Sequence, residues 1–340
     1  MKDTVDIDGA MGEGGGQIVR TSLALSAITR RPLHLVNIRP RRSRPGIQRQ
    51  HLAAIMAAQK VCSADVTGAR IGSSEIYFGP GKIAGGTYEF SIGSAGSATL
   101  VLQTILCPLM LAEHPSQVTV EGGTHNIWAP PFDFLARAFV PLVKRMGPSA
   151  RIDLKRHGFY PAGGGIIHAA IDPVPSLKPI EVNERGKVRR ITATAIVANL
   201  PETIGDREIN AVRGVLGSNI ENRVSRVESK GPGNVLLIEI ISDHITEIVT
   251  SFGRRGLPAE KVAGQAATEA RDYIGAGVPV GTHLADQLVL PLALAGGGSF
   301  VTMPPTGHLE TNIGVIKGFL PVAIRTDQVG PMAWKITIGP

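Results

Sequence analysis

The chain has 340 residues, of which 43% are hydrophobic, so it can build the core of one large domain or of two to three ordinary ones. Lys and Arg number 35 against 28 Asp and Glu, and the resulting net charge of +7 favours a polyanionic partner only modestly. The 41 glycines show no collagen-like period, and two cysteines, Cys62 and Cys107, exclude a disulfide framework and a zinc site.

The first residues of the chain, 1–8, lack the apolar core of a signal peptide. No uninterrupted apolar stretch elsewhere is long enough to cross a bilayer. Both cysteines lie in apolar stretches with a helical pattern, where we interpret them as core thiols. We therefore expect a cytoplasmic protein without a membrane partner.

One succession of elements occurs three times along the chain: a glycine-rich segment, a helix, a strand, a loop and a second helix. The first copy comprises residues 12–16, 18–28, 33–38, 39–44 and 48–61. The second comprises 93–97, 100–111, 117–120, 122–126 and 131–146. The third comprises 281–283, 285–295, 299–303, 306–312 and 313–319. We interpret this order as a threefold internal repeat.

Further alternating apolar stretches follow the second helix of the first two copies. We expect residues 76–78 to pair with 88–92 in one copy, and 151–154 with 166–171 in the other. Each unit is then a small sheet carrying two helices, and three units bury their helices in a shared core. The three loops of the repeat are candidates to converge on one cleft.

The repeat is interrupted between about Lys187 and Gly277. We interpret this stretch as an inserted α/β domain, 187–277, within a large domain formed by residues 1–186 and 278–340. Its bounding glycines, Gly186 and Gly277, fit linker positions. Its expected elements are strands at 190–198, 223–228, 234–241 and 246–252 and helices at 202–216 and 259–273.

The glycine-rich segment 12–16 leads directly into a helix, whose first N–H groups and dipole favour bound phosphate. It has neither a Walker A ending nor GxGxxG spacing, so it does not establish nucleotide binding. Glu13 repels bare phosphate unless a cation intervenes. This carboxylate is a candidate Mg²⁺ or Mn²⁺ ligand, with a solvated turn residue as the alternative.

Five arginines occur close together, interrupted by prolines. Guanidinium groups bind phosphate oxygens bidentately, so this run is a candidate site for a nucleic-acid end or a nucleotide, although a solvated basic face is the commoner origin of such a run. Few aromatic residues are interleaved, so extended single-strand stacking is not indicated. The arginines are Arg39, Arg41, Arg42, Arg44 and Arg49.

Two segments near the end of the chain contain further candidates. Asp286 near a helix start can cap that helix or, with Gln287, bind a base or ribose, and the ring of His283 can stack on adenine. His308 follows Pro304 and Pro305 in an expected turn, where an imidazole can act as base, ligand or nucleophile. The alternative is a loop histidine bonded to a nearby carbonyl group.

Several motifs together resemble the RNA 3′-terminal phosphate cyclase family, and the resemblance extends through nearly the whole chain. The motif GEGGGQ lies at residues 12–17, RPGIQRQH at 44–51, GSAGS at 93–97, RHGFYPAGGG at 156–165 and LADQ at 284–287, followed by a late Gly-His. The family architecture, three βαβαββ units plus an inserted α/β domain, agrees with the repeat. Enolpyruvyl transferases have similar units, so fold alone does not decide the function.

The resemblance implies an enzyme that uses ATP and Mg²⁺ or Mn²⁺ to convert an RNA 3′-phosphate into a 2′,3′-cyclic phosphate. His308 matches the nucleophile that takes AMP from ATP. AMP then passes to the RNA 3′-phosphate, and the adjacent 2′-hydroxyl displaces it. Glu13 matches the metal-side carboxylate, and a homodimer is expected from family habit.

The other implied site residues fall into two groups. The ATP-binding positions are Gln103, Pro130 against the adenine face, His283, Leu284, Ala285, Asp286 and Gln287. The phosphate- and RNA-binding positions are Arg20, Arg39, Arg42 and Gln50. His283 replaces a tyrosine that family members often carry, so base affinity or its pH dependence is expected to differ.

Two other classes of protein are weighed against this interpretation. A catalytically silent relative of the family acts as a binding factor in ribosome assembly, and such a protein is expected to lack the nucleophile. An enolpyruvyl transferase binds a small anionic substrate and has no use for a nucleotidyl-histidine. The presence of His308 argues against both alternatives.

Overall fold

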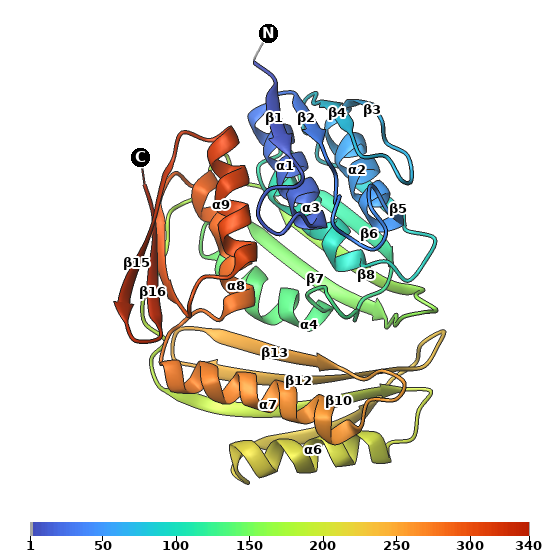
Figure 1. Cartoon of the computed structure of the whole chain (residues 1–340), viewed down its shortest axis with the longest axis vertical. Coiled ribbons are helices and arrows are strands. Elements are labelled where there is room, and N and C mark those ends of the chain that lie inside the picture. Colours follow the sequence, from blue (N-terminus) through green and yellow to red (C-terminus); the bar gives the residue numbers. More distant parts are fainter. Residues whose placement is uncertain (1–2, 340) are drawn as a thin grey trace.

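The computed structural model describes residues 3–339, whose strands form four sheets of four strands each (Figure 1). Three sheets share one strand order: β1-β2-β4-β3, β5-β6-β8-β7 and β9-β14-β16-β15. In each, the first pair is parallel and the other two pairs are antiparallel. The α+β class is therefore confirmed, and the element order of each unit reads βαβαββ.

The three units are built from the following elements. The first contains β1 (Val5–Asp8), α1 (Gly16–Thr29), β2 (Leu33–Val36), α2 (Arg49–Cys62), β3 (Asp65–Thr67) and β4 (Ile76–Gly79). The second contains β5 (Thr87–Ser91), α3 (Ala98–Met110), β6 (Ser116–Gly122), α4 (Phe132–Phe134), η1 (Leu135–Phe139), α5 (Val140–Lys144), β7 (Ser149–Arg156) and β8 (Gly165–Asp172). The third contains β9 (Glu181–Val182), α8 (Thr282–Leu294), β14 (Gly298–Thr302), α9 (Gly307–Phe319), β15 (Ala323–Gly330) and β16 (Ala333–Gly339).

The expected pairing of residues 76–78 with 88–92 is wrong. Tyr88 of β5 pairs in parallel with Val118 of β6, so β5 is the first strand of the second sheet. The antiparallel partners of β4 are β2 and β3, and β3 is a three-residue strand whose side chains are largely exposed. Such a strand has no apolar alternation, and this is why the sequence pattern does not reveal it. The other expected pair, β7 with β8, is confirmed.

The helix expected at residues 131–146 is divided by a π-helical turn, η1. The backbone N–H of Val140 donates to the carbonyl oxygen of Leu135, one residue further back than in an α-helix. Pro141 follows immediately and supplies no N–H group, and its ring clashes with the carbonyl of residue 137 in a regular helix. A π-turn is one way of relieving this conflict.

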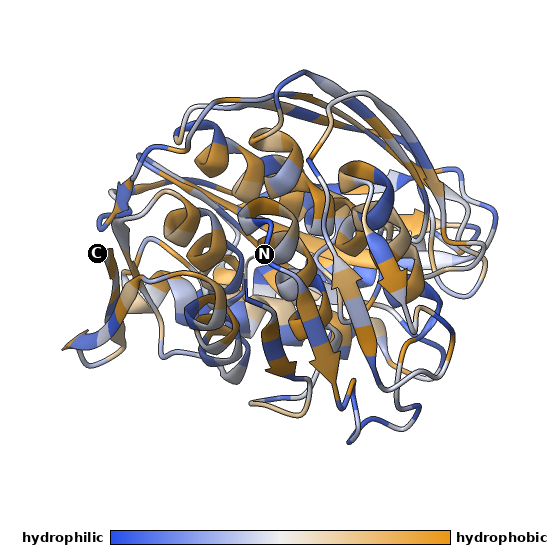
Figure 2. Cartoon of the chain, turned by 90° about the horizontal axis from the view of Figure 1, so that it is seen from above, coloured by the Kyte–Doolittle hydropathy of each residue, from blue (hydrophilic) through white to orange (hydrophobic). Residues whose placement is uncertain are grey.

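The helices of the three units pack together inside the surrounding sheets. Helix α1 contacts α2, α3 and α9, and α8 contacts α9. Seen from above, these helices are mostly hydrophobic and lie between strands on the outside (Figure 2). Cys62 and Cys107 are free thiols buried in these helices, as expected, and burial raises their pKa values to about 11 and about 12. No helix in residues 3–339 is both long and apolar enough to cross a membrane.

The fourth sheet, β11-β10-β12-β13, lies at one end of the molecule with its own two helices (Figure 1). Its elements are β10 (Val188–Ala198), α6 (Thr203–Leu216), β11 (Glu221–Arg226), β12 (Gly233–Ser242), β13 (Thr246–Phe252) and α7 (Ala259–Ala276). They form a second hydrophobic cluster. Gly186 and Gly277 have positive φ values of 73° and 70°, which favour glycine. We propose residues 187–277 as an inserted domain.

A buried carboxyl group, Glu208, lies between α6 and β12 in this part of the chain. Its Oε2 accepts a hydrogen bond from Asn234 Nδ2 at 2.9 Å, whereas its Oε1 has no hydrogen-bond partner. Burial raises the pKa of Glu208 from its ordinary value of 4.5 to about 7, although the Asn234 bond acts in the opposite direction. The unfolded chain therefore ionises this group first. Its contribution to stability is complete below pH 4.5 and is lost as the pH rises through about 7.

We expect Glu208→Gln to remove this pH dependence, because glutamine has no proton to lose. The shift corresponds to about 3 kcal/mol at pH values above 7, so the variant should unfold several degrees above the unmodified protein there. The two should unfold at similar temperatures near pH 4.5. Thermal unfolding followed across this range measures the difference, with exposed Glu228→Gln as control. A variant as pH-dependent as the unmodified protein contradicts the assignment.

Candidate active site

His308 lies in the first turn of α9 and not in a loop, so the expectation of a turn around it is wrong. Thr306 is the N-cap of this helix, and its Oγ1 accepts a hydrogen bond from the backbone N–H of Leu309 at 3.1 Å. The helix thereby starts six residues before the expected residue 313. Pro304 and Pro305 precede the cap, so they do not interrupt the helix. The side chain of His308 is 47% exposed.

The side chain of His308 forms an ion pair with Glu13, in the glycine-rich segment ahead of α1. Glu13 Oε2 lies 2.6 Å from His308 Nδ1, and the backbone N–H of Glu13 donates to Thr311 Oγ1 at 3.2 Å. The two segments approach so closely that a Cβ at Gly12 would lie 2.1 Å from Thr311 Oγ1, and one at Gly307 would lie 2.7 Å from Glu13 Oε1. Glycine at both positions lets Glu13 reach the imidazole.

The contact with Glu13 defines the chemistry of the imidazole. The two side chains form an ion pair, and a carboxylate beside Nδ1 favours the proton on that nitrogen, which leaves the lone pair on Nε2. Burial is the main influence on the pKa of His308 and lowers it, with the nearby basic groups acting in the same direction and Glu13 acting against them. The ring is thus favoured in its neutral, nucleophilic form at neutral pH.

The start of α1 presents backbone N–H groups and basic side chains together. Gly15 is the N-cap, no side chain caps the helix, and no acidic residue lies in its first turn. Arg42 Nη2 donates to the carbonyl oxygen of Glu13 at 3.3 Å, which places this arginine over the glycine-rich segment. A Cβ at Gly16 would lie 3.3 Å from Arg20 Nη1, so Arg20 lies beside the same helix start. Together they form a candidate anion site.

His51 adjoins this helix start and was not singled out by itself from the sequence, although it ends the motif at 44–51. Its Nδ1 accepts a hydrogen bond from the backbone N–H of Gln48 at 3.1 Å. Burial, with contributions from Arg20 and Arg39, lowers its pKa to about 3. The ring is therefore neutral, and its remaining nitrogen, Nε2, faces Gly16.

The arginines of the first loop differ in what they contact. Arg39 Nη1 donates to the carbonyl oxygens of Arg44 and Gly46, at 2.9 and 2.8 Å, so this side chain holds the loop together. Arg41 Nη2 donates to the carbonyl oxygen of Gly12 in the glycine-rich segment and to that of Ala10 just before it. These bonds occupy donors that the sequence alone assigns to phosphate.

The second unit joins the site through the first turn of α3. Gln50 Oε1 accepts a hydrogen bond from the backbone N–H of Ser97 at 3.3 Å. Ser97 Oγ lies 2.6 Å from Thr99 Oγ1, which donates to the carbonyl oxygen of Pro130 at 2.7 Å. Ser97 and Thr99 were not predicted, since serine and threonine at a helix start normally indicate only a cap. Here they connect Gln50 to Pro130.

The third unit joins the second through paired amides. Gln103 Nε2 of α3 donates to Gln287 Oε1 of α8 at 2.5 Å. Asp286 Oδ1 accepts a hydrogen bond from Thr306 Oγ1 at 2.8 Å, which connects α8 to the cap of the helix that carries His308. Burial raises the pKa of Asp286 to about 7, against the effect of the Thr306 bond. The sequence left open whether Asp286 caps α8, and its side-chain bond is instead to Thr306.

These contacts bring most of the expected site residues into one connected region. A chain of contacts runs from Glu13 and His308 through Thr306, Asp286 and Gln287 to Gln103. A second runs from Pro130 through Thr99 and Ser97 to Gln50. Leu284 and Ala285 are buried in the core, so only their backbone is available to a ligand.

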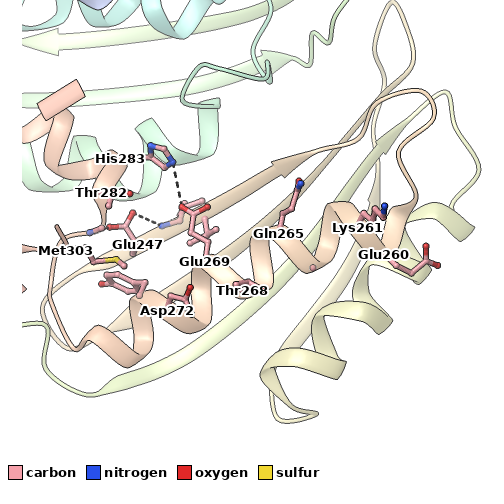
Figure 3. A pocket seen from close by; sticks show the side chains of 15 residues that line it. Glu247, Glu260, Lys261, Gln265, Thr268, Glu269, Asp272, Thr282, His283 and Met303 are labelled. Atoms are coloured by element: carbon pink, nitrogen blue, oxygen red, sulfur yellow. Dashed lines mark hydrogen bonds and ion pairs between the residues drawn. The ribbon is translucent and has the colours of Figure 1, made fainter. Parts of the chain in front are cut away.

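His283 points toward Glu269 of α7 (Figure 3). Its Nε2 lies 3.6 Å from Glu269 Oε1 across a pocket of about 860 Å³ between α7, β13 and the start of α8. Most of the ionisable residues that line the pocket are acidic: Glu247, Glu260, Glu269 and Asp272. Glu247 Oε2 accepts from the backbone N–H of Gly281 at 2.7 Å, and burial raises its pKa to about 8.

Comparison with known proteins then decides the family. The family model for RNA 3′-terminal phosphate cyclase matches residues 11–326. The chain belongs to the RNA 3′-terminal phosphate cyclase family. This membership confirms the resemblance drawn from the motifs and makes the chain an enzyme of a ligase-type family.

Similar proteins named RNA 3′-terminal phosphate cyclase come from several bacteria. The one from Koribacter versatilis (strain Ellin345) is 50% identical over 324 residues, covering 95% of this chain and 91% of its own. The one from Pseudomonas fluorescens (strain Pf-5) is 50% identical over 337 residues, covering 98% of each chain. The one from Salmonella agona (strain SL483) is 47% identical over 332 residues, covering 98% and 96%.

A solved structure, the enolpyruvyl transferase NikO from Streptomyces tendae, is 8% identical to this chain with a TM-score of 0.37. The alignment covers 99% of this chain and about half, 48%, of that structure.

Proposed function

We propose that this protein uses ATP to convert an RNA 3′-phosphate into a 2′,3′-cyclic phosphodiester, with His308 as a nucleophile that carries AMP. The observation on which the proposal rests is the contact between His308 Nδ1 and Glu13 Oε2, which leaves Nε2 without this partner and brings the ring to the glycine-rich segment ahead of α1. Family membership supports the overall reaction. The covalent steps are inferred from the geometry.

The first step transfers AMP to the enzyme. Nε2 of neutral His308 attacks the α-phosphorus of ATP, forming a nitrogen–phosphorus bond as the bond to the diphosphate oxygen breaks and diphosphate leaves. The proton stays on Nδ1, and the carboxylate of Glu13 beside it stabilises the positive charge that develops on the ring. The helix start at Gly16, Arg20 and Arg42 would hold the phosphate oxygens.

The next two steps use the RNA end. An oxygen of the RNA 3′-phosphate attacks the phosphorus of the enzyme-bound AMP, which returns His308 to its free form and leaves an RNA-adenylate. The 2′-hydroxyl of the same ribose then attacks the RNA phosphorus, losing its proton, and AMP leaves. Three simple displacements thus replace one condensation. Gln50 and Arg39 are the other proposed phosphate and RNA contacts.

The proposed nucleotide site lies between Pro130 and the paired amides of Gln103 and Gln287. Amide groups can bond to the polar edge of adenine, and the ring of Pro130 offers an apolar face. His283 would have to turn away from Glu269 to stack on the base. Because histidine stands here in place of tyrosine, stacking on the base would require breaking the contact with Glu269.

A divalent cation, Mg²⁺ or Mn²⁺, is proposed to be held by Glu13 and phosphate oxygens. Within residues 3–339 no group of three or more His, Cys, Asp or Glu side chains is placed to hold a metal. A single carboxylate completed by substrate phosphates suits Mg²⁺, which retains several waters. When bound, the cation would neutralise phosphate charge and so relieve the repulsion by Glu13.

Incubation with α-labelled ATP and Mg²⁺ or Mn²⁺ should leave label on the protein that is stable to base and released by acid, as expected for a phosphoramidate. γ-Labelled ATP should leave none, because the β- and γ-phosphates depart as diphosphate. The same protein should convert 3′-phosphate RNA into a form that phosphatase cannot dephosphorylate. Label from γ-labelled ATP, or no label from either nucleotide, contradicts the proposed covalent step. The homodimer and the cytoplasmic location stay predictions.

A further inference from the structure

Two aromatic side chains are unusually exposed. Trp128 is 91% exposed and Tyr160 is 76% exposed, more than any other large hydrophobic residue in the described part of the chain. They lie on adjacent loops: His125 bridges to Phe159 in the backbone, and the rings of these two residues stack at 5.5 Å. Trp128 follows His125 by three residues, and Tyr160 directly follows Phe159. Such side chains are available to a partner that offers flat apolar faces.

Both loops are fixed by internal bonds. Trp128 has a positive φ of 68°, a conformation that a bulky side chain rarely adopts. Two hydrogen bonds of Asn126 secure the loop. Its side-chain Nδ2 donates to the backbone carbonyl oxygen of Ala95 at 2.6 Å, and its backbone carbonyl oxygen accepts from the backbone N–H of Ala129 at 3.3 Å. On the other loop, the backbone N–H of Gly163 donates to the carbonyl oxygen of Phe159 at 2.7 Å. The aromatic side chains are thus carried on ordered backbone.

These loops are continuous with the candidate active site. Pro130 follows Trp128 by two residues and is bonded to Thr99 of α3. Asn126 is bonded to Ala95, and Ser97 in the same segment is bonded to Gln50. A Cβ at Gly163 would lie 2.8 Å from Ala95 Cα, so the Tyr160 loop reaches the same segment. The Trp128 loop therefore lies next to Pro130 of the proposed nucleotide site, and both aromatic loops contact the segment 93–97 that is bonded to Gln50, a proposed RNA contact.

The charge around this border is basic. Lys230 and Arg156 both lie near Glu121, at 3.3 and 3.5 Å, so two cations share one carboxylate. Arg49, which precedes Gln50, is exposed and has no carboxylate partner within residues 3–339. A polyanion is the partner that this combination of cations and exposed rings fits.

We propose that Trp128 and Tyr160 stack on the bases of the RNA nucleotides that immediately precede its 3′-terminal nucleotide. This rests on the proposed function, which places the terminal phosphate at the arginines and Gln50. The strand must then leave the site across its border, where its bases meet the two rings and its phosphates meet the cations. Stacking accepts any base, so the protein would bind ends of different sequence.

Tryptophan fluorescence tests the contact without any catalytic step. The chain has two tryptophans, so Trp334→Phe leaves Trp128 as the single reporter. Adding a short single-stranded 3′-phosphate RNA without ATP should quench its fluorescence. The same RNA with abasic nucleotides before its 3′-terminal nucleotide should quench far less, although its phosphate charge is unchanged. Equal quenching by both RNAs, or none by either, overturns the proposal.

Substitutions test the same contact in turnover. Trp128→Ala and Tyr160→Ala should each raise the KM for 3′-phosphate RNA about tenfold, the loss typical of one stacked base. Tyr77→Ala, at a half-exposed tyrosine on β4, is the matched control and should leave this KM unchanged. An unchanged KM in both site variants overturns the proposal. So does a loss of labelling by ATP without RNA in Trp128→Ala, which assigns Trp128 to the nucleotide.

The two proposals fail in distinguishable ways. Base-dependent quenching without any label from ATP rejects the nucleotidyl-histidine but keeps the RNA contact. Label from ATP together with base-independent quenching rejects the RNA contact but keeps the covalent step.

Discussion

His308→Ala should reduce cyclisation of 3′-phosphate RNA by at least about a thousandfold, because removal of a nucleophile eliminates the covalent route. Conversion of labelled RNA to a phosphatase-resistant form measures the loss. The control is His114→Ala, which changes an exposed histidine in the turn after α3 and should leave the rate unchanged. Cyclisation at the unmodified rate in His308→Ala removes this residue from the mechanism.

A second substrate separates the chemistry of His308 from a structural effect. RNA that already carries the 3′-adenylate bypasses the transfer of AMP to the enzyme. His308→Ala should therefore still cyclise this RNA, since only the attack of the 2′-hydroxyl remains. Loss of activity on both substrates indicates instead that the substitution has damaged the site as a whole.

Glu13 substitutions should have the second largest effect, because the carboxylate orients the imidazole from 2.6 Å. Glu13→Ala removes both the acceptor and the charge and should slow labelling by ATP about 10–100-fold, the usual cost of losing such a partner. Glu13→Gln keeps an oxygen that can accept from Nδ1. If orientation of the ring is the main role, it should retain more activity than the alanine variant.

The same pair of variants separates orientation from metal binding. If the charge of Glu13 mainly holds a cation, both variants should lose activity equally and need more Mg²⁺ or Mn²⁺. Glu310→Gln, in the same turn of α9 as His308, is the control. Unchanged labelling in Glu13→Ala at every metal concentration contradicts both roles.

The pH dependence of labelling by ATP also tests the position of Glu13. Glu13 raises the pKa of His308 against the larger effect of burial. Removing the charge lowers that pKa further, so the fall in labelling toward acid should move to lower pH in Glu13→Gln. A shift to higher pH contradicts the placement of the carboxylate beside the ring.

Elements with a strong local pattern were predicted well, and elements defined by distant pairing were not. The strands and helices of residues 187–277 carry clear alternation or helical periodicity, and each occurs near its expected position. Strand β9, by contrast, has only two residues, Glu181 and Val182. It pairs with β14, more than 100 residues further along the chain, so no local pattern marks it as the first strand of the third unit.

The candidate site shows the same distinction. His308 and Glu13 occur in recognisable glycine motifs, but their contact joins opposite ends of the chain. Gln103 and Gln287 are 184 residues apart, and only the packing of α3 near α8 brings their amides together. The prediction of a loop at His308 is wrong for a local reason. Thr306 caps the helix, and prolines before a cap do not prevent the helix from forming.

Side-chain direction is the part that sequence could not supply. Arg39 and His283 lie in segments that the motifs single out, but Arg39 bonds to backbone carbonyls and His283 faces Glu269. Both directions depend on partners that residue types alone do not identify. The arginine motif therefore predicts a basic loop, and the structure shows which group each arginine of the loop contacts.

Mass spectrometry of the protein after treatment with ATP and Mg²⁺ or Mn²⁺ tests the central claim most directly. The intact protein should gain the mass of one AMP, and fragmentation under non-acidic conditions should place it on Nε2 of His308. An unmodified mass, or AMP attached to a lysine or to another histidine, contradicts the claim.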